Sequence, residues 1–289
     1  MSGILGSSPS GTYAPARVHC PSFNLVRPAT GLSQNETDWL ILRRSNAIDA
    51  LETWLPRALA IVQNNTFDLT EYICTLRSNS SFVPVTGLAF SGGGARAALS
   101  GYGAWQALDE RYPPSRKAGT GGIAQALTYL SALSGGGQPV GAISMSNYAT
   151  LEQLLHYGTD QGNITASPAG DPNPTVAHAA TLQYLQQISL KAEKGFNVSV
   201  TDLFAFVIGS QILFNESAGV STARMARTWS DIQSYPEFAD GKYPMPIVMA
   251  NEIVLPGIPD VTEFFGSVRP FYNASNNTIV CLSSSLADL

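Results

Sequence analysis

Apolar residues recur at helical spacing after a polar first segment. Residues 1–31 are rich in Gly, Ser and Pro, so we expect an extended lead-in there. Ser33-Gln-Asn-Glu36 has capping-box spacing, in which Ser33 accepts from the Glu36 amide while Glu36 reaches back. The apolar positions that follow are Trp39, Leu42, Ile48, Leu51 and Leu55. They predict a helix up to Pro56 and a second helical stretch from there to Val62.

Two later segments share the order strand, glycine turn, helix. Residues 83–90 are β-branched and aromatic and lead into Ser91-Gly92-Gly93-Gly94, after which apolar residues step by three along a helix that we expect to stop at Pro113-Pro114. Residues 128–133 predict a second strand, Ser134 begins a turn with Gly135-Gly136-Gly137, and residues 140–145 suit a helix. Successive units of this kind predict an α/β fold, with a parallel sheet and helices on both faces.

The second half of the chain has fewer signals. Residues 175–192 predict a helix and residues 244–254 a buried strand. The longest apolar stretch, Leu203 to Phe214, is shorter than the roughly 18 residues of a membrane span, so we expect a buried helix or a lipid-facing wall and no transmembrane span. We divide the chain into the lead-in, residues 1–31, and a partial catalytic domain, residues 32–289.

Composition limits the classes of function. The 289 residues are 44% hydrophobic, which allows one large or two ordinary domains. Charged residues make up only 13% of the chain and the net charge is −5, without long runs of like charge, so a nucleic acid is not an expected partner.

Glycosylation motifs are frequent. Asn-x-Ser/Thr without an intervening Pro begins at Asn35, Asn64, Asn79, Asn163, Asn197, Asn215, Asn273 and Asn276. Glycans at these sites would supply the polarity that the few charges do not, so we expect a secreted or cell-surface glycoprotein. Residues 1–19 contain no signal peptide, and we therefore expect that the true start of the protein has been lost.

The three cysteines, Cys20, Cys74 and Cys281, are too scattered for a metal site. An oxidising compartment would let two of them pair and leave one over, which suggests a missing partner. The pairing is left open.

Ser134 is the candidate nucleophile. A serine between a strand and a glycine-rich turn has the local order of a nucleophile elbow, although serine-glycine tracts are also common as plain turns. The turn at Gly92-Gly93-Gly94 could present bare amides to a developing oxyanion, and Arg96 adds a positive charge suited to a phosphate. A nucleotide-phosphate loop is the alternative, but Gly-Lys-Ser/Thr and Gly-x-Gly-x-x-Gly are both absent from this turn.

The histidines are His19, His156 and His178, and none is a convincing base. His156 and His178 follow Ser134 closely and fall in predicted helices, where packed or surface histidines are more common. The remaining option is a serine activated by a carboxylate alone.

Several motifs in order resemble the fungal lysophospholipase/phospholipase B family, relatives of cytosolic phospholipase A2. These are Cys20-Pro21, Leu25-Val-Arg-Pro-Ala29, Phe90-Ser-Gly-Gly-Gly-Ala-Arg96-Ala, Thr128-Tyr-Leu-Ser-Ala-Leu-Ser134-Gly-Gly-Gly, Trp229-Ser-Asp-Ile232 and Pro244-Met-Pro-Ile-Val248. The similarity runs from about Tyr13 to Gly266. It implies a patatin-like and cytosolic phospholipase A2-like α/β core, with a parallel-rich sheet flanked by helices.

The resemblance also implies roles for residues of this chain. Ser134 matches the nucleophile of a Ser/Asp dyad, Gly93 and Gly94 match the oxyanion-hole glycines, and Arg96 matches the arginine that steadies the substrate phosphate. The implied substrates are lysophospholipids and diacyl phospholipids, cleaved through an acyl-serine intermediate with no metal or organic cofactor. Transient contact with a lipid surface is the implied partnership.

The chain departs from the family pattern at several places. Ala132 stands where the family usually has Gly, and Gln138 where it has an aromatic. Pro139 would remove a helix donor unless it falls in the first turn. The family's Asp-Gly-Gly segment is not among these residues, and Asp240-Gly241-Lys242 is not that motif, so we expect the core to be incomplete at its C-terminal side.

Two hypotheses follow. In the first, the protein is a lysophospholipase/phospholipase B, a carboxylic ester hydrolase acting in phospholipid catabolism. In the second, it is a catalytically inactive, truncated glycoprotein of the same family that binds lipid without cleaving it or has no function.

Overall fold

The computed structural model describes residues 8–17, 30–63, 66–158, 172–212, 227–247, 272–273 and 278–279. The chain divides into two compact units. Residues 29–165 and 232–248 form the first, here called the sheet unit, and residues 1–28, 166–231 and 249–289 form the second, here called the helix-pair unit. The predicted domain boundary after residue 31 stays a prediction.

The sheet unit contains a parallel sheet, which confirms the expected α/β class. Within the described residues its strands lie in the order β1 (Gly87–Phe90), β2 (Tyr129–Ala132), β3 (Met245–Pro246), and both pairings are parallel. The register pairs Phe90 with Ala132, so the two strands end level with each other. Strand β1 is shorter than the predicted 83–90, and residues 248–254 of the third predicted strand lie outside the described residues.

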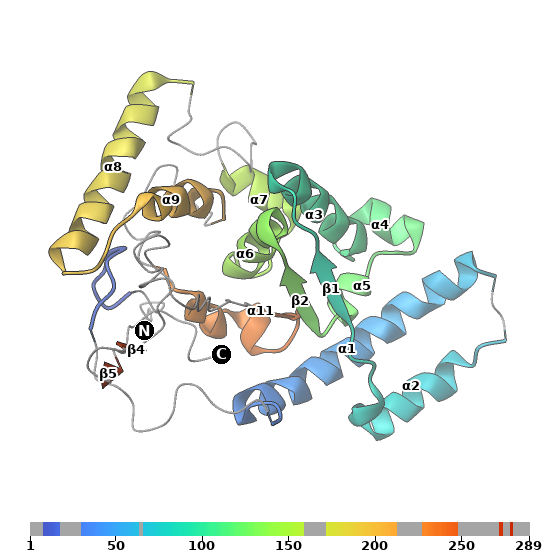
Figure 1. The fold of residues 1–289 in the computed structure, drawn as a ribbon. Helices are drawn as coiled ribbons and strands as arrows, with labels where there is room; N and C mark the ends of the chain where they lie inside the picture. The colour runs from blue at the N-terminus through green and yellow to red at the C-terminus, as the bar shows by residue number, and fades with distance from the viewer. Residues whose placement is uncertain are drawn as a thin grey trace, which may run out of the picture. The chain divides into compact units, whose positions relative to one another are not determined.

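Helices flank this sheet (Figure 1). The two longest of them in the sheet unit are α1 (Gln34–Ile61) and α3 (Gly94–Leu108). The shorter elements are α2 (Leu69–Ser78), η1 (Ser80–Phe82), α4 (Pro113–Ala118), α5 (Ile123–Ala126), η2 (Ser134–Gly136), α6 (Gly137–Met145), α7 (Leu151–Gly158) and α11 (Pro236–Ala239). A 3₁₀ helix, η4 (Trp229–Ser234), spans the boundary between the two units.

The N-terminus of α1 differs in part from the predicted capping box. The Ser33 hydroxyl accepts from the Glu36 amide at 3.1 Å, as expected. Glu36 does not reach back to the cap, because its carboxylate accepts the Tyr129 hydroxyl of β2 at 2.7 Å. A tertiary hydrogen bond has replaced the local one and ties the start of α1 to the sheet.

Pro56 does not divide α1, so the prediction of two helical stretches was wrong. A proline inside a helix removes one hydrogen bond, but packing on both sides of this position holds the helix together. The Trp54 indole donates to the Gly119 carbonyl at 2.8 Å, and Arg57 donates to the Gly121 carbonyl at 2.7 Å.

Pro113 and Pro114 begin a helix instead of ending one. Helix α3 ends at Leu108, and the two prolines occupy the first turn of α4, where a missing amide costs nothing. Asp109, in extended conformation, ends α3, and its buried carboxylate accepts three hydrogen bonds from the Arg111 guanidinium.

Arg43 of α1 forms hydrogen bonds with the segments that precede β2 and β3. Its side chain is fully buried and donates to the carbonyl of Leu127 at 2.8 Å, that of Gly241 at 2.7 Å, and that of Gln125. Burial lowers the pKa of the guanidinium to about 10, so it stays charged at neutral pH. These bonds satisfy carbonyls just before β2 and β3, at the ends of the strands opposite to the glycine turns.

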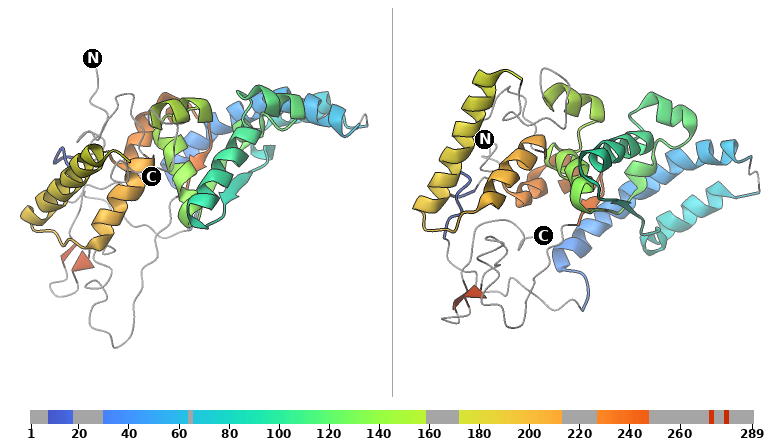
Figure 2. Two further views of the ribbon diagram at one scale, coloured as in Figure 1. Left: turned by 90° about the horizontal axis from the view of Figure 1, so that it is seen from above. Right: turned by 45° about the horizontal axis from the view of Figure 1, so that its top comes forward.

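The helix-pair unit contains α8 (Pro174–Glu193), which confirms the helix predicted at 175–192, and α9 (Val200–Ile212). They lie side by side (Figures 1 and 2). Lys191 and Asp202 form a buried ion pair between them at 2.5 Å, and the Tyr13 hydroxyl donates to Asp202 at 2.7 Å. Two short segments, β4 (Tyr272–Asn273) and β5 (Thr278–Ile279), pair antiparallel.

The apolar stretch predicted as a buried helix or a lipid-facing wall falls largely in α9, and Phe214 lies outside the described residues. Phe206 is buried and stacks on Tyr184 of α8 with ring centroids 5.1 Å apart, whereas Phe204 is 63% exposed. Among the described helices, none combines the length and hydropathy that crossing a bilayer requires.

Candidate active site

Ser134 directly follows β2 at a sharp change of backbone direction. Leu133 is extended, and Ser134 then takes a φ of 51°, in the left-handed region that non-glycine residues rarely occupy. Such strain persists only where the surrounding structure fixes it, and it is common at functional sites. Its result here is that the side chain of Ser134 lies exposed at the end of the strand.

The glycines after Ser134 are required by close packing. A Cβ on Gly136 would lie 2.6 Å from the Ser91 carbonyl oxygen, and one on Gly135 would overlap the Gly94 backbone, 2.8 Å from its nitrogen. A side chain at Gly135 or Gly136 would therefore force the backbone to move. The turn at 134–136 is therefore pressed against the turn at 91–94.

The turn at 91–94 also has unusual backbone geometry. Gly93 has a φ of 137° and Gly94 a φ of 63°, values that glycine tolerates best. Gly93 caps α3 without any side-chain acceptor, and the amides of Gly93 and Gly94 donate to none of the described residues. Bare amides at the N-terminus of a 15-residue helix favour a negative charge there.

Parallel pairing brings these two turns together. The Leu133 amide donates to the Phe90 carbonyl at 3.0 Å, which continues the ladder to the end of both strands. A Cβ on Gly92 would stand 3.1 Å from the Ser134 Cβ. The serine and the glycine turn thus face one region of space, while the catalytic roles assigned to Ser134, Gly93 and Gly94 stay predictions.

Arg96 is the third residue of α3 and is exposed. Its guanidinium makes no ion pair or hydrogen bond to any part of the chain that the structure describes. A charge without an internal partner is available to an anion in solution, and arginine suits phosphate because it offers paired donors. Its predicted role in phosphate binding stays a prediction.

The structure does not identify a base for Ser134. No described residue accepts a hydrogen bond from the Ser134 hydroxyl. His178 is exposed on α8 in the helix-pair unit, while His19 and the side chain of His156 lie outside the described residues. Across the described ranges, no group of three His, Cys, Asp or Glu side chains is arranged to hold a metal ion.

Two of the departures from the family pattern, Ala132 and Pro139, fit the turn. Ala132 is half-buried in β2, and Pro139 falls in the first turn of α6, where it removes no helix hydrogen bond. Pro139 is almost fully buried, and a Cβ on Gly101 of α3 would lie 2.7 Å from its Cγ. Gly101 thus permits close contact between α3 and α6, a constraint that sequence reasoning missed because it depends on a residue 38 positions away.

Leu133 is a second feature that sequence reasoning missed. Its side chain is 70% exposed although it directly precedes Ser134, so it places apolar surface at the edge of the site. Strand alternation pointed the other way: successive residues of a strand face opposite sides, so an apolar residue next to an exposed serine is expected to be buried.

Among solved structures, the fold is similar to a cytosolic phospholipase A2. A structure of human GIVD cytosolic phospholipase A2 in complex with methyl gamma-linolenyl fluorophosphonate inhibitor and terbium chloride matches with a TM-score of 0.54 and 23% sequence identity. The match covers 78% of this chain and 28% of that one. The class is therefore an α/β protein with a cytosolic phospholipase A2-like core.

Sequence comparison narrows this class. The family described as "Lysophospholipase catalytic domain" matches residues 86–265, and the chain belongs to this family. Lysophospholipase 2 of Aspergillus fumigatus is 37% identical over 278 residues, and Lysophospholipase 2 of Saccharomyces cerevisiae is 37% identical over 247 residues. The matches cover 91% and 83% of this chain but 46% and 34% of those proteins, so the chain spans less than half the length of these relatives.

Proposed function

We propose that this chain carries the nucleophile of a lysophospholipase/phospholipase B, which hydrolyses fatty acyl esters of lysophospholipids and other glycerophospholipids. The observation that carries the proposal is the strained turn at Ser134, which has a φ of 51°. It packs against a glycine turn in which the Gly93 and Gly94 amides donate no hydrogen bond within the described residues. Relatives named lysophospholipase at 37% identity support the same substrate class.

In the proposed reaction, the Ser134 oxygen attacks the ester carbonyl carbon and its proton passes to a base. The Gly93 and Gly94 amides donate to the oxyanion that forms, and Arg96 holds the substrate phosphate. Collapse of this intermediate breaks the bond to the glycerol oxygen, which takes up the proton and leaves an acyl-serine. Water then attacks the acyl-serine, releasing the fatty acid and restoring the hydroxyl. The family resemblance implies an aspartate as the base.

A fluorophosphonate probe tests the nucleophile, because it reacts with an activated serine and stays bound. We expect mass spectrometry to locate the label on Ser134, and Ser134→Ala to abolish labelling. Ser131→Ala, three residues earlier in β2, is the matched control and should leave labelling intact. Folded wild-type protein that takes no label would contradict the proposal.

Lipid binding without hydrolysis is the second candidate function. The observation in its favour is that none of the described residues accepts a hydrogen bond from the Ser134 hydroxyl, so the structure offers no base for it. A cooperatively folded, secreted protein that binds lysophospholipid vesicles, takes no label and releases no fatty acid would select this function over the first.

We further propose that the protein is a secreted or cell-surface glycoprotein. Three of its acceptor asparagines, Asn35, Asn79 and Asn197, are exposed among the described residues. At Asn79 the side-chain oxygen accepts from the Ser81 amide at 3.0 Å, which leaves the nitrogen that would carry a glycan without a hydrogen bond there. Expression through a secretory route followed by enzymatic deglycosylation should lower the mass, and Asn79→Gln should remove one glycan. Secreted protein of unmodified mass would contradict glycosylation.

A further inference from the structure

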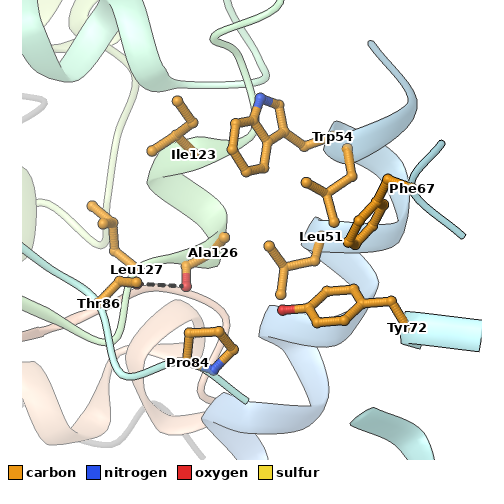
Figure 3. A pocket seen from close by; sticks show the side chains of 10 residues that line it. Leu51, Trp54, Phe67, Tyr72, Pro84, Thr86, Ile123, Ala126 and Leu127 are labelled. Atoms are coloured by element: carbon orange, nitrogen blue, oxygen red, sulfur yellow. Dashed lines mark hydrogen bonds between the residues drawn. The ribbon is translucent and has the colours of Figure 1, made fainter. Parts of the chain in front are cut away.

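A half-open apolar pocket lies in the sheet unit, on the side of α1 that faces α2 and α5 (Figure 3). Its volume of about 440 Å³ falls within the range of small-molecule sites, roughly 300–1,000 Å³. Leu51, Trp54 and Leu55 of α1 form one wall, and Phe67 and Tyr72 form a second. Residues before β1 and in α5 complete it.

The pocket and Ser134 lie at opposite ends of the sheet. Pro84 and Thr86, which line the pocket, precede β1, and Leu127 precedes β2. The Gly92–Gly94 turn and Ser134 follow those same strands. Strands rise by about 3.3 Å per residue, so four residues separate the two places by roughly 13 Å. None of the residues that line the pocket belongs to the turns at 91–94 and 134–136, so the pocket does not contain the candidate nucleophile.

The polar atoms of the lining are almost all engaged. The Trp54 indole donates to the Gly119 carbonyl at 2.8 Å, and the Thr86 hydroxyl donates to the Ala126 carbonyl at 3.4 Å. No charged side chain lines the pocket. The Tyr72 hydroxyl is the exception, because it has no hydrogen-bond partner among the described residues and points toward the pocket in Figure 3.

This lining distinguishes between types of occupant. A peptide segment would bring backbone amides and carbonyls, and a dry lining with one spare hydroxyl could satisfy few of them, which makes their burial costly. An acyl chain brings no polar group except the carboxylate at its end. Because the pocket is half-open, water can solvate that charge while Tyr72 donates one hydrogen bond to it. A cavity of about 150 Å³ holds benzene, so a volume roughly three times larger accommodates about 15 to 18 carbons.

We propose that this pocket binds one long-chain fatty acid, with its chain against Trp54 and Leu51 and its carboxyl group on Tyr72. The choice of a fatty acid rests on the proposed function, in which a fatty acid is the released product. The pocket then gives the protein a product-binding site separate from Ser134.

Quenching of tryptophan fluorescence by 9,10-dibromostearic acid tests this proposal, because bromine quenches only a nearby indole. The measurement uses the Ser134→Ala protein, so that neither turnover nor covalent labelling contributes. We expect saturable quenching with one molecule bound per chain, and Trp54→Phe in that background should remove most of the quenching while equilibrium dialysis still detects binding.

Filling the pocket gives the matched pair of variants. Ala126→Phe places a ring in the cavity and should weaken binding at least tenfold, whereas Ala60→Phe, at an exposed position of α1 outside the lining, should leave it unchanged. Tyr72→Phe keeps the ring and removes only the hydroxyl, and should weaken binding about fivefold. Thermal melts establish that each variant is folded. If Ala126→Phe does not fold, the loss of binding in Tyr72→Phe tests the proposal in its place.

The proposal is overturned if the Ser134→Ala protein shows no saturable quenching, if quenching survives Trp54→Phe, or if folded Ala126→Phe or Tyr72→Phe binds as well as the Ser134→Ala parent. Failure of the proposed function has a different signature, namely wild-type protein that a fluorophosphonate does not label. Binding in the Ser134→Ala protein does not depend on that reaction, so the two failures are told apart.

Discussion

Gly92 lies so close to Ser134 that a Cβ on Gly92 would stand 3.1 Å from the Ser134 Cβ. That separation is tighter than ordinary van der Waals contact, so a side chain at Gly92 would push the serine or its turn aside. The relationship links two segments that are 42 positions apart in the sequence. It makes the geometry of the serine depend on the glycine turn after β1 as much as on its own turn.

Gly135→Ala should disable the site, because the new Cβ would overlap the Gly94 backbone. We expect loss of fluorophosphonate labelling and a fall of about 1–3 kcal/mol in the free energy of unfolding, the usual cost of overpacking. Gly137→Ala is the matched control, since a Cβ there meets no atom within 4 Å. Labelling and urea unfolding measure the two effects, and equal labelling of both variants would show that the turns are not in close contact.

Arg96→Ala should weaken turnover of phosphate-bearing substrates selectively. With lysophosphatidylcholine we expect kcat/KM to fall about tenfold, corresponding to about 1.4 kcal/mol of lost binding in the transition state. With an uncharged p-nitrophenyl ester kcat/KM should not change, because that substrate has no phosphate to hold. Arg116→Ala, at an exposed arginine of α4, is the control. An equal loss of kcat/KM on both substrates would mean that Arg96 supports the structure of the turn and does not bind phosphate.

Local patterns made the strand, turn and helix units predictable. The runs ending at Phe90 and Ala132 combine apolar strands with glycine turns, and each signal lies within about ten residues of sequence. The position of Ser134 follows from the same local order. Its left-handed backbone, however, is fixed by contact with the turn after β1, and that contact could be inferred only by assuming that the two strands pair.

Long-range contacts account for what the sequence could not predict. Pro56 continues α1 because Trp54 and Arg57 bond to Gly119 and Gly121, 64 or 65 positions away. The Glu36 carboxylate does not bond to the N-cap of α1 and instead accepts a hydrogen bond from Tyr129, 93 positions away. No spacing rule marks such partners, and the base for Ser134 belongs to the same class of problem, since it too would be distant in sequence.

Arg43→Met should destabilise the sheet unit strongly. Methionine fills similar space but leaves the carbonyls of Gln125, Leu127 and Gly241 without their donor, and buried unsatisfied groups cost about 1–3 kcal/mol each. We expect at least about 3 kcal/mol of lost stability in urea unfolding. Arg116→Met, at the exposed arginine, should change stability by less than about 0.5 kcal/mol. Similar losses in both variants would contradict the role of Arg43.

The Lys191–Asp202 pair predicts a pH dependence in the helix-pair unit. Burial alone would raise the pKa of the Asp202 carboxyl, but hydrogen bonds from Lys191, Tyr13 and the Ser199 amide outweigh it and hold the pKa below its usual value of 3.8. The folded protein therefore binds fewer protons than the unfolded chain as pH falls below about 4. The stability that Asp202 contributes is fully present above its unfolded pKa and is lost as pH falls through the folded pKa.

Asp202→Asn should lower stability at pH 7 by about 3 kcal/mol, because it leaves Lys191 buried without its counter-charge. The difference from the wild type should shrink as pH falls from 5 toward 2, since protonation removes the same charge from the wild type. Glu193→Gln, at an exposed carboxylate of α8, should match the wild type at every pH. Thermal melts followed by near-UV circular dichroism across this range measure the effect, and a gap between Asp202→Asn and the wild type that stays constant with pH would refute it.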